Sequence, residues 1–210
     1  MKMLPAIRRA LWTAVAIFAA VNVALIFWTD RRNPGSSEQA VSGRGGGIRP
    51  EFELTDHTGR RVTARDYRGK WLLVFFGFTN CPDICPTTLG EIAGVVSALG
   101  SLAEGVRPLF VSIDPARDRV PDIARYVAAF HPAIVGLTGS EADIATVAKN
   151  FRVYYEKVAR SEAAPGDYTM AHTTATYLVD PEGRFDRVYA YGTSAKDIAG
   201  DLKKRMENPP

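Results

Sequence analysis

The stretch Phe76-Gly-Phe-Thr-Asn-Cys-Pro-Asp-Ile-Cys-Pro86 decides the fold, because it separates two opposite sequence patterns. The run that leads into it, Trp71-Leu-Leu-Val-Phe-Phe76, is continuously apolar, which predicts a strand covered on both faces. A helix is predicted after the cysteine stretch, because apolar residues recur there at helical spacing: Leu89, Ile92, Ala93, Val96 and Leu99. Gly100 is expected to end this helix. Cys81 and Cys85 therefore lie where a buried strand gives way to a helix.

These two cysteines are the only ones in the 210 residues. If the first helical turn has formed by Cys81, the i, i+4 spacing puts both sulfurs on one face, with Cβ atoms roughly 5–6 Å apart. That separation can close on a metal or, after slight adjustment, on a disulfide. Unpaired N–H groups and the positive dipole end of a helix start favour the reactive thiolate over the thiol.

Inert buried thiols and a purely structural disulfide are the alternatives for the cysteine pair. Pro82 and Pro86 suit a helix start better than a core, which counts against inert thiols. A disulfide across so short a loop would add little stability, because the benefit of loop closure grows with loop length. We therefore interpret Cys81 and Cys85 as functional residues.

The N-terminal part predicts a membrane anchor and a tether. Lys2, Arg8 and Arg9 precede an uncharged, mostly apolar run over residues 10–28, which as a helix would span roughly 28 Å, about one bilayer core. A cleaved signal peptide is the alternative, although its apolar region is usually shorter. The expected order is a cytoplasmic N-terminus (1–9), a transmembrane anchor (10–28), a flexible linker (29–48) and a domain (49–210). The domain would lie on the extracytoplasmic, periplasmic side of an inner membrane that the chain crosses once.

The charge distribution argues against a nucleic-acid partner. Seven of the 26 Lys and Arg, but only two of the 23 Asp and Glu, lie in the first fifty residues, so the remainder is close to neutral. No basic stripe or aromatic-basic motif is visible in it.

Residues from 49 onward predict one α/β domain with a mixed sheet flanked by helices. Its expected elements are a hairpin over 52–63, strands over 71–76, 108–113 and 134–137, helices from the cysteines, Pro121 and Ser140, a strand-like run over 153–158, an irregular segment over 159–171, a hairpin over 173–191 and a helix from Ser194. This is the thioredoxin order, with an added N-terminal hairpin and an inserted irregular segment. Right-handed crossovers would put the two long strands side by side, with the cysteines at their carboxyl edge.

His172 is the third candidate for the site. In the thioredoxin order, the residue just before the first strand of the last hairpin faces the active cysteines. Here that residue is His172, whose side chain is an imidazole. Two thiolates and one imidazole form a soft set of three donors that suits copper, whereas zinc would require a fourth ligand. His57, in a turn, and His131, before Pro132, are not expected to be ligands. Met170, on the same side of an extended chain as His172, is the reserve candidate.

The motifs Phe78-Thr-Asn-Cys-Pro-Asp-Ile-Cys-Pro86 and Ser112-Ile-Asp-Pro-Ala-Arg-Asp118, with the strand after His172, resemble the Sco/SenC family. The resemblance implies a membrane-anchored, thioredoxin-fold metallochaperone that binds copper, both Cu(I) and Cu(II), and that delivers copper to the binuclear copper centre of cytochrome c oxidase. It implies Cys81, Cys85 and His172 as copper ligands, and Asp114 as a residue behind the ligands or facing a partner. The implied partners are the copper-bearing subunit of the oxidase, a copper donor protein and a thiol reductant. Alternatively, Asp114 simply caps the end of its strand.

Two other classes of function stay open. A specialised thiol–disulfide oxidoreductase would use a redox-active Cys81–Cys85 disulfide to keep the copper-ligand cysteines of a target reduced, although C-x-x-x-C is one residue longer than the usual redox motif. A copper or redox sensor would instead signal to a membrane partner. Only the oxidoreductase alternative would make the protein an enzyme.

Overall fold

The computed structural model describes residue 22, residues 47–160 and residues 167–207. The predicted anchor over 10–28, apart from residue 22, and the predicted linker over 29–48, apart from residues 47 and 48, lie outside these residues. Among the described residues, one helical stretch, Ile84–Gly105, has the length and apolar composition of a membrane span. It lies inside the folded domain, where seven of its residues, from Cys85 to Leu99, are buried.

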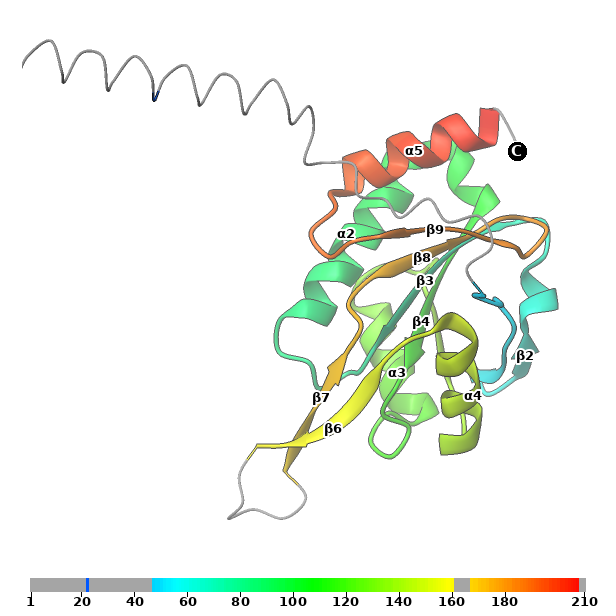
Figure 1. Cartoon of the computed structure of the whole chain (residues 1–210). Coiled ribbons are helices and arrows are strands. Elements are labelled where there is room, and N and C mark those ends of the chain that lie inside the picture. The colour runs from blue at the N-terminus through cyan, green and yellow to red at the C-terminus, as the bar shows by residue number, and fades with distance from the viewer. Residues whose placement is uncertain (1–21, 23–46, 161–166, 208–210) are drawn as a thin grey trace, which may run out of the picture. The chain divides into compact units, whose positions relative to one another are not determined.

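A seven-stranded mixed sheet forms the centre of the domain, in the order β2-β1-β5-β4-β3-β8-β9 (Figure 1). Its strands are β1 (Glu53–Asp56), β2 (Arg61–Thr63), β3 (Trp71–Gly77), β4 (Val106–Ser112), β5 (Val135–Thr138), β8 (Thr176–Val179) and β9 (Phe185–Tyr189). Strands β3 and β4 run parallel, in register from Trp71 opposite Val106 to Gly77 opposite Ser112. The expected hairpin at each end of the domain and the adjacent pair of long strands are confirmed.

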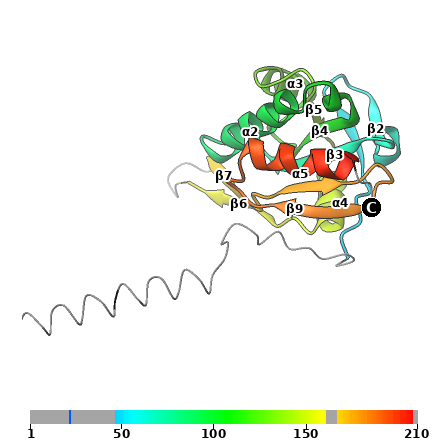
Figure 2. The same ribbon diagram turned by 90° about the horizontal axis from the view of Figure 1, so that it is seen from above.

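Strand β3 is buried along its whole length because helices cover both faces of the sheet. Helices α2 (Ile84–Leu99) and α5 (Ala195–Glu207) lie side by side over the face that carries Trp71 and Leu73 (Figure 2). Helix α4 (Glu141–Phe151) covers the opposite face, where Phe76 meets Phe151 with ring centroids 5.2 Å apart. Helix α3 (Val120–Ala128) packs on β5, and two short 3-10 helices, η1 (Ala64–Tyr67) and η2 (Gly100–Gly105), complete the connections.

Helix α4 begins where the sequence predicts. The Ser140 side chain accepts a hydrogen bond from the Asp143 N–H at 3.1 Å, and the Asp143 carboxylate accepts one from the Ser140 N–H at 3.0 Å. This capping box supplies partners for two backbone donors at the helix start.

The cysteine helix begins three residues later than the spacing argument assumed. Helix α2 starts at Ile84, with Asp83 as its N-cap, so Cys81 precedes the helix and only Cys85 lies in its first turn. The physical reason is Pro82, whose ring disfavours the helical conformation for the preceding residue. Pro86 fits inside the first turn because backbone N–H groups there have no partner within the helix. The assumption that both sulfurs share one helix face is therefore wrong.

The run predicted to be strand-like, 153–158, contains a strand, and the segment expected to be irregular, 159–171, overlaps a second one. Strands β6 (Tyr155–Ala159) and β7 (Tyr168–His172) pair antiparallel, with Tyr155 opposite His172, and form a separate two-stranded ribbon that projects from the domain (Figure 1). Strand β7 has little apolar periodicity of its own, and its stability comes from pairing with β6. His172 therefore ends a strand, whereas we expected it to follow an irregular segment.

Candidate metal centre

Cys85 lies in the first turn of α2, and its side chain is fully buried against β3. The room for its sulfur comes from Gly77, the last residue of β3. A Cβ atom at Gly77 would lie 2.8 Å from Cys85 Sγ, 3.0 Å from the Phe110 ring and 3.1 Å from the Phe75 ring. The sulfur thus occupies the place that a side chain at residue 77 would need.

His172 faces this sulfur. Its Nε2 lies 3.8 Å from Cys85 Sγ, and its Nδ1 lies 2.8 Å from the Thr173 carbonyl oxygen. A carbonyl only accepts hydrogen bonds, so this contact assigns the proton to Nδ1 and leaves the Nε2 lone pair directed at the sulfur. The rings of Phe75 and Phe78 pack edge-on against the imidazole, with centroids 6.2 and 5.9 Å away. The imidazole is therefore oriented and partly shielded from water.

Cys81 is half-buried beside the other two residues. Its sulfur accepts a hydrogen bond from the Cys85 N–H at 3.4 Å, and both cysteines are free thiols. Over residues 47–160 and 167–207, no group of three His, Cys, Asp or Glu side chains is gathered closely enough to hold an ion as it stands. The structure brings Cys85 and His172 together, with the Cys81 sulfur bonded to the Cys85 N–H beside them.

Burial controls the protonation of the two residues that are in place. It raises the pKa of the Cys85 thiol well above its ordinary value, against a hydrogen bond from the Phe78 backbone that acts in the opposite direction. Burial also lowers the pKa of His172, although its bond to the Thr173 carbonyl acts against this. The expectation that the helix start favours a thiolate is therefore wrong for Cys85, because desolvation outweighs the dipole. At neutral pH the metal-free pair is a thiol and a neutral imidazole.

Asp118 is a site residue that our sequence reasoning did not single out. It is fully buried, and it accepts hydrogen bonds from the Thr79 N–H at 2.9 Å, the Thr79 hydroxyl at 2.6 Å and the Ser112 hydroxyl at 2.6 Å. Burial raises the pKa of Asp118, while the bonds from Ser112 and Thr79 lower it. The carboxyl group thereby ties the cysteine loop to the end of β4. A second acidic residue four positions after Asp114 was the available signal.

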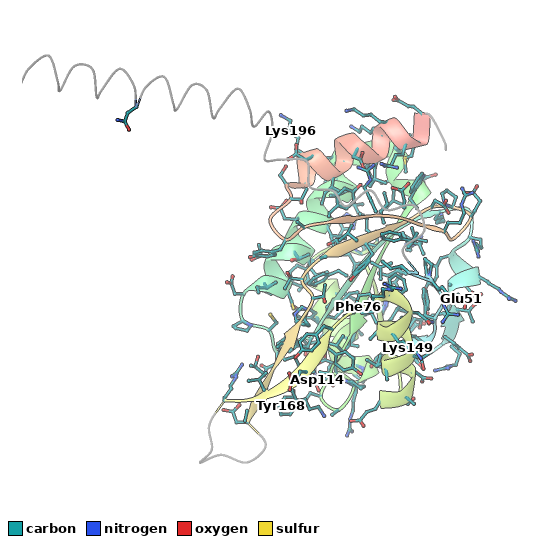
Figure 3. All side chains as sticks on the ribbon, in the orientation of Figure 1. Glu51, Phe76, Asp114, Lys149, Tyr168 and Lys196 are labelled. Atoms are coloured by element: carbon teal, nitrogen blue, oxygen red, sulfur yellow. The ribbon has the colours of Figure 1, made fainter. Side chains whose placement is uncertain are left out.

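Asp114 supports the strand that carries His172. It is fully buried, its Oδ1 accepts the Tyr168 hydroxyl at 2.7 Å, and its Oδ2 accepts Nε of Arg117 (Figure 3 labels Asp114 and Tyr168). The Arg117 guanidinium also lies 3.8 Å from the centroid of the Tyr168 ring and donates to the Tyr168 carbonyl at 2.9 Å. Asp114 therefore connects the end of β4 to β7. Its side chain is buried and makes these contacts within the chain, which is compatible with a place behind the proposed ligands.

The remaining sequence candidates occupy structural positions. His57 Nδ1 accepts the Gly136 N–H at 3.1 Å and so joins the first turn to β5. His131 Nδ1 accepts the Ala133 N–H at 3.1 Å within its own loop. Met170 is buried in the core, two residues before His172 on β7.

Comparison with known proteins identifies the family. The SCO1/SenC family model matches residues 42–207. The chain belongs to the SCO1/SenC family. It is 42% identical over 170 residues to the mitochondrial SCO2 homolog of Bos taurus, a match that covers 80% of this chain and 61% of that protein. The chain thus spans less than two thirds of this Sco relative.

Solved Sco structures share the fold. Arabidopsis thaliana ScoI with copper bound is 37% identical, with a TM-score of 0.71 and coverage of 76% of this chain and 98% of that one. Bradyrhizobium japonicum ScoI with copper bound is 43% identical, with a TM-score of 0.68 and coverage of 73% and 96%. A more distant structure, 25% identical with a TM-score of 0.57 and coverage of 79% and 95%, is BsSco, described as having a disulfide switch and as a member of the Sco family of cytochrome c oxidase assembly proteins. The expected thioredoxin-like fold is confirmed.

Substituting Gly77 tests whether the position of the Cys85 sulfur depends on the missing side chain. In Gly77→Ala the added methyl would collide with the sulfur and two rings, so we expect a loss of about 1–3 kcal/mol in the free energy of unfolding. Copper affinity should fall as well. Gly90→Ala is the control, because a Cβ there meets nothing within 4 Å and alanine should stabilise α2 by roughly 0.5–1 kcal/mol. Urea unfolding and copper titration measure both effects; unchanged values for Gly77→Ala would contradict the packing argument.

The raised pKa of Cys85 predicts a stability that falls in alkali. Above the ordinary thiol value of 9.0 the unfolded chain releases this proton while the folded, reduced and copper-free protein keeps it. The folded state then binds more protons, so the free energy of unfolding decreases as pH rises. Urea unfolding of the parent and of Cys85→Ala between about pH 8 and pH 10 should show a difference between the two proteins that shrinks with pH. A constant difference would mean that Cys85 titrates normally.

Proposed function

We propose that this protein is a copper metallochaperone that binds copper through Cys81, Cys85 and His172 and delivers it to the binuclear copper centre of cytochrome c oxidase. The observation that carries the proposal is the pair formed by Cys85 Sγ and His172 Nε2, 3.8 Å apart, with the imidazole lone pair directed at the sulfur. The Thr173 carbonyl fixes the tautomer that a metal needs.

The spacing of this pair suits a small transition-metal ion. Protein bonds to zinc, an ion of similar size, are about 2.3 Å to sulfur and about 2.0–2.1 Å to nitrogen. At a trigonal bond angle of about 120° such bonds separate the two donor atoms by about 3.8 Å, which is the distance in the structure. A trigonal centre has one more position, and Cys81 is the neighbouring side chain with a free sulfur that could fill it. Two soft thiolates and an imidazole favour copper over hard cations.

The buried Cys85 thiol makes copper binding a proton exchange. Copper takes the place of the thiol proton, which is released to solvent, and this raises the cost of binding at low pH. Copper is then the ion that the protein delivers and not a resident cofactor. Because Cys81 is half-buried and Cys85 is buried, Cys81 is the ligand that a copper donor or acceptor protein could contact. The proposed partners are a copper donor protein, the copper-bearing subunit of the oxidase and a thiol reductant.

The oxidoreductase alternative is not favoured by the environment of Cys85. A thiol that attacks disulfides is usually exposed and has a lowered pKa, whereas Cys85 is fully buried and its pKa is raised. A Cys81–Cys85 disulfide remains compatible with the proposal as an off state, because it consumes both thiolate donors. The description of BsSco as having a disulfide switch supports this possibility in the family.

Removal of each ligand tests the copper site. We expect a large loss of copper affinity in each of three variants, Cys81→Ala, Cys85→Ala and His172→Ala. Loss of a residue that only hydrogen-bonds to a metal ligand typically costs roughly 10–100-fold in affinity, and loss of a ligand itself should cost more. His57→Ala and His131→Ala are the controls, because their ring nitrogens are bonded to Gly136 and Ala133. Competition titrations with Cu(I) and Cu(II) measure the effect, and His172→Ala should lose Cu(II) more completely, since imidazole suits Cu(II). Parental affinity in His172→Ala would remove this residue from the site and direct attention to Met170.

The same titration on oxidised protein separates the two functions. The disulfide form should bind copper far more weakly than the reduced form, and bound copper should protect both cysteines from alkylation. Equal affinity in the two redox states would end the metallochaperone proposal and favour the oxidoreductase.

We also propose that residues 10–28 anchor the protein in the inner membrane with the domain on the extracytoplasmic side. The support is the uncharged apolar run and its basic flank. An alkaline phosphatase fusion after Pro210 should be active, because this enzyme works only outside the cytoplasm. An inactive but stably made fusion would contradict the orientation, and a mature N-terminus beyond residue 28 would contradict the anchor.

A further inference from the structure

The hydroxyl of Tyr126, on α3, is buried without a hydrogen-bond partner. Among the described residues only one other buried side-chain polar atom, Nη2 of Arg117, shares this state. An unpaired buried polar group costs about 1–3 kcal/mol, so folded proteins rarely retain one without a reason. The Arg117 side chain is held by several other bonds, whereas the hydroxyl is the only polar group of Tyr126.

The Tyr126 ring lies next to the wall of the metal centre. It packs on Phe110, with ring centroids 5.4 Å apart, and on Phe130, with centroids 5.2 Å apart. The Phe110 ring and Cys85 Sγ border the same space above Gly77, at 3.0 and 2.8 Å from a Cβ placed there. Tyr126 and Cys81 also pack against the core cluster that contains Cys85. Two aromatic contacts thus hold the phenol against the Phe110 ring, which itself borders the Cys85 sulfur.

The electrostatics of the phenol agree with this position. Burial raises the pKa of Tyr126 most, and negative charge on Cys85, on Cys81 and on Asp118, in that order, raises it further. A charge on either sulfur would therefore be felt at the hydroxyl. The same shift keeps the phenol protonated, so that it remains a donor.

We propose that the Tyr126 hydroxyl is a positioning group for copper, which donates a hydrogen bond to a copper-bound cysteine sulfur and has no partner until copper arrives. This inference rests on the proposed function. A thiol sulfur is a weak acceptor, but the sulfur becomes a charged acceptor when copper replaces its proton. The thiol proton leaves to solvent, the phenol keeps its own proton, and no electron is transferred in the step.

The hydrogen bond would also tune the copper. A donor directed at a thiolate withdraws electron density from the sulfur, and hydrogen bonding around a cysteine ligand is a known means of adjusting a copper potential. Reduced donation favours Cu(I) over Cu(II). Tyr126 would thus bias the centre toward the reduced ion without contacting it.

Tyr126→Phe in the full-length protein tests this inference, because it keeps the ring contacts and removes only the oxygen. In the copper-free protein the free energy of unfolding should stay the same or rise, since an unpaired polar atom is removed. Copper affinity should fall on the order of ten-fold, the equivalent of a hydrogen bond to a charged group. The sulfur-to-Cu(II) charge-transfer band should move to longer wavelength, because the sulfur regains electron density.

Tyr189→Phe is the matched control. The Tyr189 hydroxyl donates to Asp201 at 2.6 Å on the β9–α5 side of the domain, so its loss should lower the stability of the copper-free protein and leave the copper affinity and the band unchanged. If Tyr126→Phe has the copper affinity and the spectrum of the parent, the inference about Tyr126 is wrong while the proposed function stands. A lower stability of the copper-free variant would contradict the inference in the same way. If the ligand variants show that the parent binds no copper at Cys81, Cys85 and His172, the proposed function fails and this inference fails with it.

Discussion

The approach of the Cys85 sulfur to the backbone of β3 at Gly77 is the constraint on which the rest of the site depends. It places the sulfur under the sheet edge, where water is excluded and the thiol keeps its proton. It also sets where the imidazole of His172 must lie to reach the sulfur, between the rings of Phe75 and Phe78. A larger residue at position 77 would collide with the sulfur and with the rings of Phe75 and Phe110, and so displace the helix from the strand.

Sheet topology then brings three distant parts of the chain to this point. The parallel pairing of β3 and β4 ends both strands at one edge, so the loops after Gly77 and after Ser112 lie together. Asp118 fastens the first loop to the second through Thr79, and Asp114 fastens the second loop to β7 through Tyr168. Two buried carboxyl groups four residues apart thus hold in place the segments that carry the proposed ligands, without contributing a ligand to the proposed set.

Sequence patterns predicted the main sheet because its strands are apolar enough to be recognised one at a time. Trp71 to Phe76 needs no partner to be identified as a buried strand, and Ser140 with Asp143 marks a helix start by local chemistry alone. Strand β7 was not predicted, because it is ordered by cross-strand pairing with β6 and by the contacts of Tyr168 with Asp114 and Arg117. The thiolate expectation failed for a related reason, since the burial of Cys85 depends on its contact with Gly77, eight residues earlier in the sequence, and not on the helix start itself.

The separate ribbon has a consequence for the kinetics of metal release. His172 belongs to a two-stranded sheet whose hydrogen bonds are not part of the seven-stranded sheet against which Cys85 packs. Proteins open in cooperative units of unequal stability, and a peripheral ribbon is a unit that can detach while the central sheet stays intact. The lifetime of a complete ligand set would then follow the local opening free energy of the ribbon and its Asp114–Tyr168 attachment. Two Sco proteins with equal melting temperatures could in this way release copper at very different rates.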